Sequence, residues 1–236
     1  MRDGTLNTIR IFSFIGLIAV TGGCDTNAAL SPKPLAEIKA QPGRAPDTRS
    51  KTDLARNRVW SLTRDGVFFH DRATPEKIVQ VQLPDWQWAG TPYGCLPDLA
   101  LGPKGEIVVT SDVLPTLWRI DPETLAVSVH PLELDADSHK DVGFSGLVYS
   151  SEHGAFFAVN YFHGSLWRID PLFGGARKIS LTAPVPRACG LAVRPRAGRQ
   201  ETPAGLCVRA PQGGWSIDLA PDQRTGHVRA ASCTDR

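Results

Sequence analysis

The sequence contains little that would place it inside a membrane or on nucleic acid. Its longest apolar run covers residues 11–20, only ten residues, whereas a transmembrane helix needs about 20. The formal net charge is +2, from 26 basic and 24 acidic side chains, so no excess of charge favours a phosphate backbone. The sequence also lacks a dinucleotide-binding fingerprint, a phosphate-binding glycine loop and a nucleophile elbow. We therefore expect no nucleic-acid partner and none of these common enzyme classes.

The sequence is equally poor in metal-binding motifs. Its six His are scattered, and none lies at a ligand-like spacing from another His or from Cys, so no zinc motif is present. Residues 135–141 alternate Asp with other residues, but this segment lacks the Gly and the terminal Glu of an EF-hand loop. We interpret it as a solvated loop, and these patterns predict no cofactor.

The N-terminus carries a recognisable export signal. The apolar run of residues 11–20 follows a basic start and is closed by small residues that end in Cys24, as in a secretory signal. This ending resembles the bacterial lipobox, which implies that Cys24 is lipidated and becomes the mature N-terminus. Ordinary cleavage near Ala28 is the alternative. We expect an exported protein, anchored to a membrane by its lipid and facing the periplasm or the cell exterior.

Composition divides the chain into three parts. Residues 1–23 form the signal, and residues 24–56 are rich in Pro, basic and nearly free of aliphatic clusters. A segment of that kind buries too little apolar surface to order itself, so residues 24–56 are predicted to be a flexible tether. Residues 57–236 form the predicted folded domain.

Four further cysteines occur at positions 95, 189, 207 and 233. In an exported chain they predict two disulfides, and free buried thiols are the alternative. The sequence leaves the pairing open. A bond between Cys189 and Cys207 would leave Cys95 to pair with Cys233, whereas a bond between Cys207 and Cys233 would tie down the C-terminal strand.

One short sequence motif occurs four times, once in the second half of each of four similar units. An aromatic residue is followed three residues later by Asp, and the steps between the aromatics are 50, 49 and 48 residues. The copies begin at Phe68, Trp118, Trp167 and Trp215. This period, with about four short strands per unit, predicts an all-β fold, a β-propeller of about four ~49-residue repeats of antiparallel strands. Four repeats make either a small closed propeller or a partial ring.

Most of the repeated residues are predicted to be scaffold. The aromatic residues are expected between neighbouring blades, and the Asp is expected to open the turn that follows its strand. The first unit lacks a clear first strand before residue 57. Part of residues 24–56 is an alternative source of one more strand, which would pair with the last blade and close the ring.

Two stretches resemble the blades of a known superfamily. Residues 97–129 and 145–181, each containing Leu-Trp-Arg-Ile-Asp-Pro, resemble NHL and SMP-30/gluconolactonase-like propellers. The resemblance implies a lactonase hypothesis, in which oxygen ligands at the starts of the innermost strands hold a divalent cation such as Ca²⁺. The matching positions include Ser145 and Cys189, and only Asp98 offers a carboxylate. A displaced metal set would consist of Asp98, Asp112, Glu152 and Asn160.

We therefore interpret the protein as a non-enzymatic binding or scaffolding module for a protein or small-molecule partner. The loops that lead into innermost strands should converge on one mouth of the propeller, and exposed aromatic residues there are favoured anchors. Packing of Trp86 and Trp88 between blades is the alternative. The candidate binding residues are Trp86, Trp88, Tyr93, Asp98, Phe144 and Arg187. The competing hypothesis is an SMP-30-like metal-dependent lactonase or hydrolase, or a related propeller lyase.

Overall fold

All the regular structure consists of β-strands. The computed structural model describes residues 48–89, 95–137, 140, 142–194, 205–211, 213–231 and 233, and within them the chain forms seventeen strands. No helix in this part of the chain is long and apolar enough to cross a membrane. The signal, the lipidation candidate Cys24 and the candidate binding residue Tyr93 lie outside the described residues.

The strands form four antiparallel units, each built from four consecutive strands, which we call blades 1 to 4; parallel pairing at the outer edge joins blades 3 and 4 and β9 into one nine-stranded sheet. Blade 1 consists of β1 (Arg49–Asp53), β2 (Arg58–Thr63), β3 (Gly66–Asp71) and β4 (Val79–Val81). Blade 2 consists of β5 (Leu99–Leu101), β6 (Ile107–Thr110), β7 (Thr116–Ile120) and β8 (Val127–Pro131). Blade 3 consists of β10 (Gly146–Ser150), β11 (Ala155–Val159), β12 (Leu166–Ile169) and β13 (Gly175–Leu181). Blade 4 consists of β14 (Leu191–Arg194), β15 (Gly205–Ala210), β16 (Gly213–Leu219) and β17 (Thr225–Ala231).

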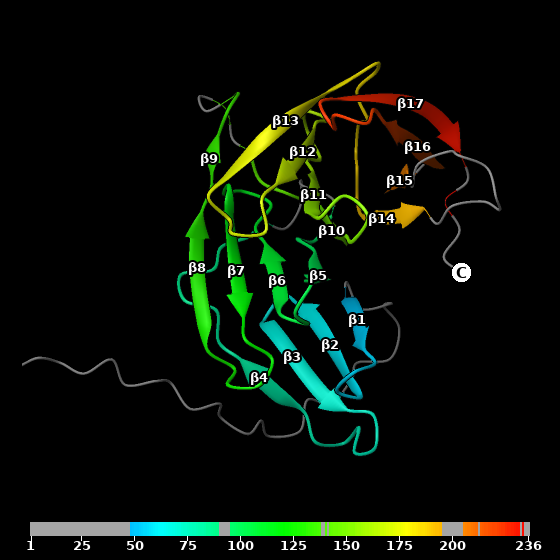
Figure 1. The fold of residues 1–236 in the computed structure, drawn as a ribbon. Helices are drawn as coiled ribbons and strands as arrows, with labels where there is room; N and C mark the ends of the chain where they lie inside the picture. The colour runs from blue at the N-terminus through cyan, green and yellow to red at the C-terminus, as the bar shows by residue number, and fades with distance from the viewer. Residues whose placement is uncertain are drawn as a thin grey trace, which may run out of the picture.

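This arrangement confirms the predicted all-β fold of four repeats with four strands each. The first strand of every blade is innermost, and these strands contact one another in the order β1, β5, β10, β14. Figure 1 shows the blades following one another around an arc, from blue and cyan through green to orange and red. At the outer edge, β13 pairs in parallel both with the short β9 (Glu133–Leu134) and with β17 of the next blade.

Apolar side chains fill the spaces between successive blades. The described residues form three large apolar clusters, one for each of the three junctions along the arc. Trp118 lies in the cluster between blades 1 and 2, and Trp167 lies in the cluster between blades 2 and 3. Both are essentially inaccessible to solvent, as the repeat predicts. A closed ring of four blades would need a fourth cluster, so the described part of the chain is a partial ring.

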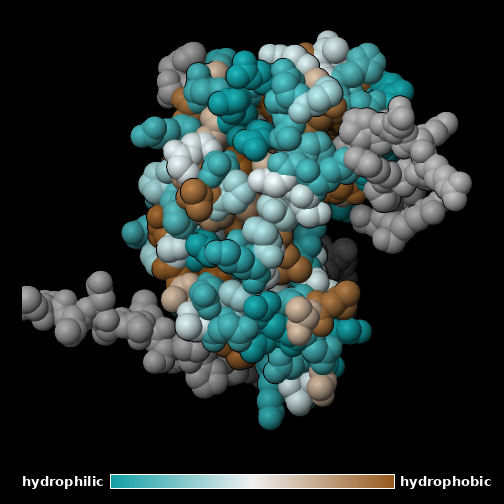
Figure 2. All heavy atoms as spheres, viewed as in Figure 1, coloured by the Kyte–Doolittle hydropathy of each residue, from teal (hydrophilic) through white to brown (hydrophobic). Residues whose placement is uncertain are grey.

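The two outer faces of the arc carry many polar side chains. Side chains alternate between the faces of a strand, and those of blade 1 that point away from Trp60 include Ser50, Ser61 and Gln80. The repeated aromatic Phe68 lies between Ser61 and Gln80 on this face and is 7% exposed, although no blade precedes it. On blade 4, the corresponding face carries Arg194, Ser216, Asp218 and Arg229. The view in Figure 2 is also mostly hydrophilic, with scattered hydrophobic residues. Polar end faces are typical of the capping units of repeat proteins.

Strand β1 begins blade 1 inside the range that was expected to be a tether. It pairs with β2, so the first blade starts before residue 57, and residues 48–56, the described part of this range, contribute no strand to the last blade. The sequence Arg-Ser-Lys-Thr-Asp has no apolar alternation to reveal a strand. The physical reason is its position: one side of β1 belongs to the polar end face, and its other side carries Arg49, Lys51 and Asp53.

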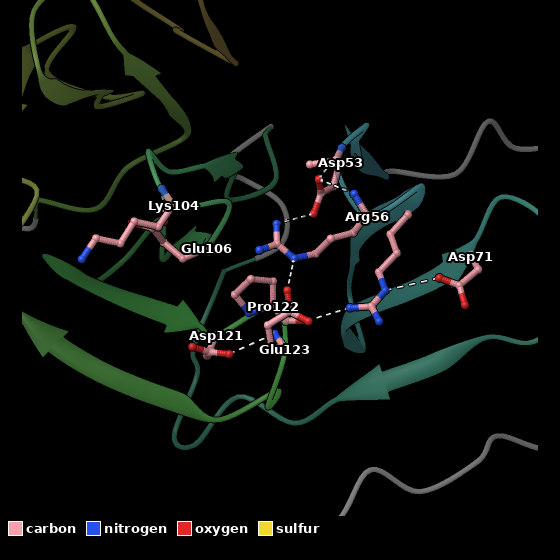
Figure 3. A network of polar contacts seen from close by, with 10 residues as sticks. Asp53, Arg56, Asp71, Lys104, Glu106, Asp121, Pro122 and Glu123 are labelled. Atoms are coloured by element: carbon pink, nitrogen blue, oxygen red, sulfur yellow. Dashed lines mark hydrogen bonds and ion pairs between the residues drawn. The ribbon is translucent and has the colours of Figure 1, made fainter.

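A network of charged groups joins blades 1 and 2 (Figure 3). Arg56, in the turn after β1, bonds through Nη1 to Asp53 (3.2 Å) and through Nε to Glu123 (2.6 Å). Arg58 donates to the carbonyl of Pro122 (2.6 Å) and pairs with Asp71 (3.3 Å). The polar β1–β2 segment is therefore fastened to the β7–β8 turn of the next blade.

Candidate functional site

The innermost strands β5, β10 and β14 all begin at one end of the arc, which we call the mouth, and a disulfide crosses it. Cys95, just before β5, is bonded to Cys189, just before β14, with a Cα–Cα distance of 5.4 Å. Arg49, at the start of β1, donates a hydrogen bond to the carbonyl of Cys189. Covalent and polar contacts therefore connect blades 1, 2 and 4 over this opening.

The second disulfide joins Cys207 on β15 to Cys233, near the C-terminus. Two disulfides were predicted, and the structure selects the pairing in which the C-terminal strand is tied down. The alternative pairing of Cys189 with Cys207 is wrong: these residues stand in the same blade, but Cys207 lies on its outer face and Cys189 lies at the mouth.

Asp98 connects the innermost strands of two blades. It is only 4% exposed, and its Oδ1 accepts a hydrogen bond from the backbone N–H of Leu99 at 2.9 Å. Its Oδ2 accepts one from the backbone N–H of Leu147 in the next blade at 3.0 Å. Nearby, the hydroxyl of Ser145 donates to the carbonyl of Ala188 at 2.5 Å. These groups satisfy the backbone between blades, which is a structural use of their oxygens.

The other members of the displaced metal set are held apart or already bonded. The amide nitrogen of Asn160 donates to Gly143 (2.6 Å), and its oxygen accepts from the backbone of His163 (2.7 Å). Glu152 is exposed in the turn after β10, at the opposite end of that strand from Asp98. Among the described residues, no group of three or more His, Cys, Asp or Glu is placed to hold a metal ion.

Asp112 is the one member of that set with an unsatisfied oxygen. It is 6% exposed; its Oδ1 accepts from the backbone N–H of Ala89 at 2.8 Å, and its buried Oδ2 has no hydrogen-bond partner. Burial raises the pKa of this carboxyl to about 6. Gly143 packs directly on the backbone of Asp112, where a Cβ would lie 1.9 Å from the carbonyl carbon.

The pKa of Asp112 predicts a dependence of stability on pH. Because the folded state holds this proton more tightly than the unfolded state, where the pKa is near 3.8, the stability should fall as the pH rises from about 4 to about 7. Asp112→Asn should remove that loss and raise the free energy of unfolding at neutral pH by roughly 3 kcal/mol, which corresponds to the rise of the pKa from 3.8 to about 6. Urea unfolding at a series of pH values measures it.

Asp121 provides the control of opposite sign. Its pKa is lowered, chiefly by the backbone hydrogen bond from Thr124 and then by that from Glu123. Its contribution to stability is therefore present above pH 4 and is lost as the pH falls. Asp121→Asn should thus reduce stability at neutral pH.

For Asp112, equal pH profiles of the free energy of unfolding for the wild type and Asp112→Asn would contradict the assigned role of its carboxyl.

The aromatic loop after β4 is mostly part of the scaffold. Trp86 packs against the cluster between blades 1 and 2, and its Nε1 donates to the carbonyl of Thr110 at 2.9 Å. Trp88 donates to the carbonyl of Arg64 at 3.2 Å, with its ring centre 6.4 Å from that of Trp86. Phe144 is fully buried between blades 2 and 3. The structure thus favours the packing interpretation for Trp86 and Trp88, and it places Phe144 in the core.

Arg187, one of the candidate binding residues, borders a cavity. The cavity has a volume of about 640 Å³ and lies at the mouth end of blade 4. It is lined by Pro186, Arg187, Ala210, Pro211, Gly213, Gly214, Trp215, Ala230 and Ala231. Arg187 is exposed, whereas its backbone N–H is fixed to the carbonyl of Tyr161 at 3.1 Å.

Trp215 is the residue that the sequence analysis missed, because it shares the repeat position of the buried Trp118 and Trp167. In this blade the Trp is only partly buried and forms a wall of the cavity. A signal does exist in the sequence. Gly213-Gly214 precedes Trp215, where blades 2 and 3 have a polar residue followed by Leu117 or Leu166. Leu117 and Leu166 point to the opposite face of their strands from the Trp and pack in the next junction, so Gly214 marks blade 4 as the last blade of the arc.

No protein-family model matches the sequence, and no curated protein matches it. Among solved structures, the chain is similar to the allergen Mala s 1 of Malassezia sympodialis, at 13% identity and a TM-score of 0.51, over 75% of this chain and 60% of that one. It is also similar to an auxiliary nutrient binding protein from Bacteroides thetaiotaomicron, at 10% identity and a TM-score of 0.53, over 79% and 43%. A virginiamycin B lyase from Staphylococcus aureus is similar at 15% identity and a TM-score of 0.44, over 76% and 50%.

These comparisons define the class of protein by its fold. The four blades and their arc make the chain a β-propeller protein. The chain spans about half the length of the three structures named above. Identities this low show the fold alone, so the function has to be argued from the residues of this chain.

Proposed function

We propose that the protein is an exported, lipid-anchored β-propeller that binds a partner or ligand and catalyses no reaction. The observation that carries the proposal is that the Cys95–Cys189 disulfide and the hydrogen bond from Arg49 to Cys189 cross the mouth. The carboxylate that would begin a metal site, Asp98, has both oxygens occupied by backbone N–H groups. The lactonase hypothesis requires free oxygen ligands at this point.

Export is supported by the two disulfides, because disulfides form and persist in oxidising compartments. The auxiliary nutrient binding protein offers a precedent for a binding role on a similar fold, and this supports the proposal without identifying a ligand. The remaining exposed surface near the mouth, around Arg187 and Trp215, is where we place the binding function.

Metal analysis tests the proposal. The purified protein, prepared without chelator and then dialysed against Ca²⁺, should hold far less than one ion per chain and should melt at the same temperature with and without Ca²⁺. A panel of lactones should not be hydrolysed above the buffer rate. One tightly held divalent ion per chain together with lactone turnover would establish the hydrolase hypothesis instead.

The lipid anchor is tested separately by Cys24→Ser in a bacterial host. Without the thiol, no diacylglycerol can be attached, so the protein should move from the membrane fraction to the soluble exported fraction. Asn27→Ser is the matched control, since it places a serine three residues further on, keeps the thiol of Cys24 and both disulfides, and should leave the membrane association unchanged. Retention of the Cys24→Ser protein in the membrane fraction would refute lipidation at this residue.

A further inference from the structure

The cavity beside Trp215 has the composition of a small-molecule site. Its volume of about 640 Å³ lies within the range of roughly 300–1,000 Å³ that is typical of ligand pockets. Three parts of the chain form it: the connection into β14, the β15–β16 turn and the end of β17. The β15–β16 turn and the end of β17 belong to adjacent antiparallel strands of blade 4, in which Trp215 on β16 pairs with Val208 on β15 and with Ala230 on β17.

The aromatic wall is flat and is kept open by small neighbours. Trp118 and Trp167 use their ring nitrogens for hydrogen bonds to Pro84 (2.7 Å) and Ser165 (3.0 Å), and both rings are buried. Trp215 instead faces residues with little or no side chain, namely Ala210, Gly213 and Ala230. A Cβ on Gly213 would meet no atom within 4 Å, which shows that the space beside the turn is open.

The charge of the cavity has one sign. Arg187 is the only charged residue among the described residues that line it, and no carboxylate stands with it. Arg187 has a φ of 56°, and its backbone is anchored to Tyr161 of blade 3, so the root of the side chain is fixed while the guanidinium remains exposed. A guanidinium in this position can bind a carboxylate through two parallel hydrogen bonds.

We propose that this cavity binds a small carboxylate with a flat apolar face, which stacks on Trp215 while its carboxylate pairs with Arg187. The inference rests on the proposed binding function and gives it a ligand class. An aromatic ring against Trp215 uses the stacking preference of indole, and the single positive charge selects an anion over a neutral analogue of the same shape.

The test compares 2-naphthoate with 2-naphthamide, which has the same ring and no charge, by isothermal titration calorimetry on the purified protein. We expect 2-naphthoate to bind roughly tenfold or more tightly than the amide, the factor expected for one charge-assisted pair. Arg187→Asn should abolish this preference. Asn is chosen because it tolerates the positive φ at this position better than most residues.

Two further variants test whether binding takes place in this cavity or elsewhere on the protein. Ala230→Phe fills the space opposite Trp215 from an exposed position of β17, and it should weaken binding of both compounds roughly tenfold while the melting temperature stays close to that of the wild type. Arg224→Asn makes the same chemical change as Arg187→Asn in the exposed β16–β17 turn, at the other end of the blade. It should leave both affinities within about twofold of the wild type, because it is remote from the cavity.

Equal affinities for the acid and the amide, full binding by Ala230→Phe, or no binding of 2-naphthoate at millimolar concentration would each overturn the proposal. These outcomes are distinct from a failure of the proposed function, which would appear as a bound divalent ion and lactone turnover.

Discussion

Replacing Trp167 by Ala should lower the free energy of unfolding by about 3–5 kcal/mol, the range found for large aromatic residues removed from protein cores. The side chain is fully buried between blades 2 and 3, where its ring centre lies 6.4 Å from that of Phe144. Its Nε1 donates to the hydroxyl of Ser165. The substitution would therefore open a cavity in the junction and leave a buried hydroxyl without its partner.

Trp215 provides the matched comparison, because it occupies the same repeat position and is only partly buried. Trp215→Ala should cost clearly less, about half as much or below, since part of the ring already contacts solvent. Urea unfolding followed by circular dichroism measures both values, and Trp118→Ala should behave like Trp167→Ala. Equal losses for Trp167 and Trp215 would show that the fourth blade is packed like the others and that the cavity is filled.

Removal of the mouth disulfide should have an effect of similar size. Cys95 and Cys189 are 94 residues apart, and the loop-entropy relation gives about 4.7 kcal/mol for the double replacement by Ser. Cys207 and Cys233 are 26 residues apart, for which the same relation gives about 3.5 kcal/mol. The difference arises because the longer loop gains more freedom in the unfolded chain.

Each double variant serves as the control for the other, since each removes one bond from the same oxidised protein. Denaturant unfolding under non-reducing conditions gives the two losses directly. The mouth variant should also lose the link between blades 2 and 4. A larger loss for the Cys207–Cys233 variant would mean that chain entropy does not govern the contribution of these bonds.

The repeat made the architecture predictable from the sequence. The period placed four units of four strands, and the aromatic positions in blades 2 and 3 are buried as expected. The turn role of the repeated Asp holds for Asp121 and Asp170, whose Oδ1 atoms accept backbone hydrogen bonds from the following turn. It fails for Asp218, which lies within β16 and pairs with Arg194 and Arg229 on the outer face.

The functional surface was less predictable, because it depends on which sides of the repeats lack a neighbour. Asp98 looked like a metal ligand by its position before β5, but its two oxygens are used to join β5 and β10. That bond spans 49 residues of sequence and has no local signal. Arg187 was identified from its loop, whereas Trp215 was assigned to the scaffold because its phrase matched the buried copies.

The polar end faces also decide how copies of the protein meet one another. An arc built from repeats has two different ends, and apolar ends would let one molecule add to the next head to tail, as in an open filament. Here Arg194, Asp218 and Arg229 lie on one end, and on the other end Ser50, Ser61 and Gln80 surround the single aromatic ring of Phe68. Association of these ends would bury charged and hydroxyl groups at a net cost. Growth into fibres is therefore disfavoured, even at high local concentrations of the protein.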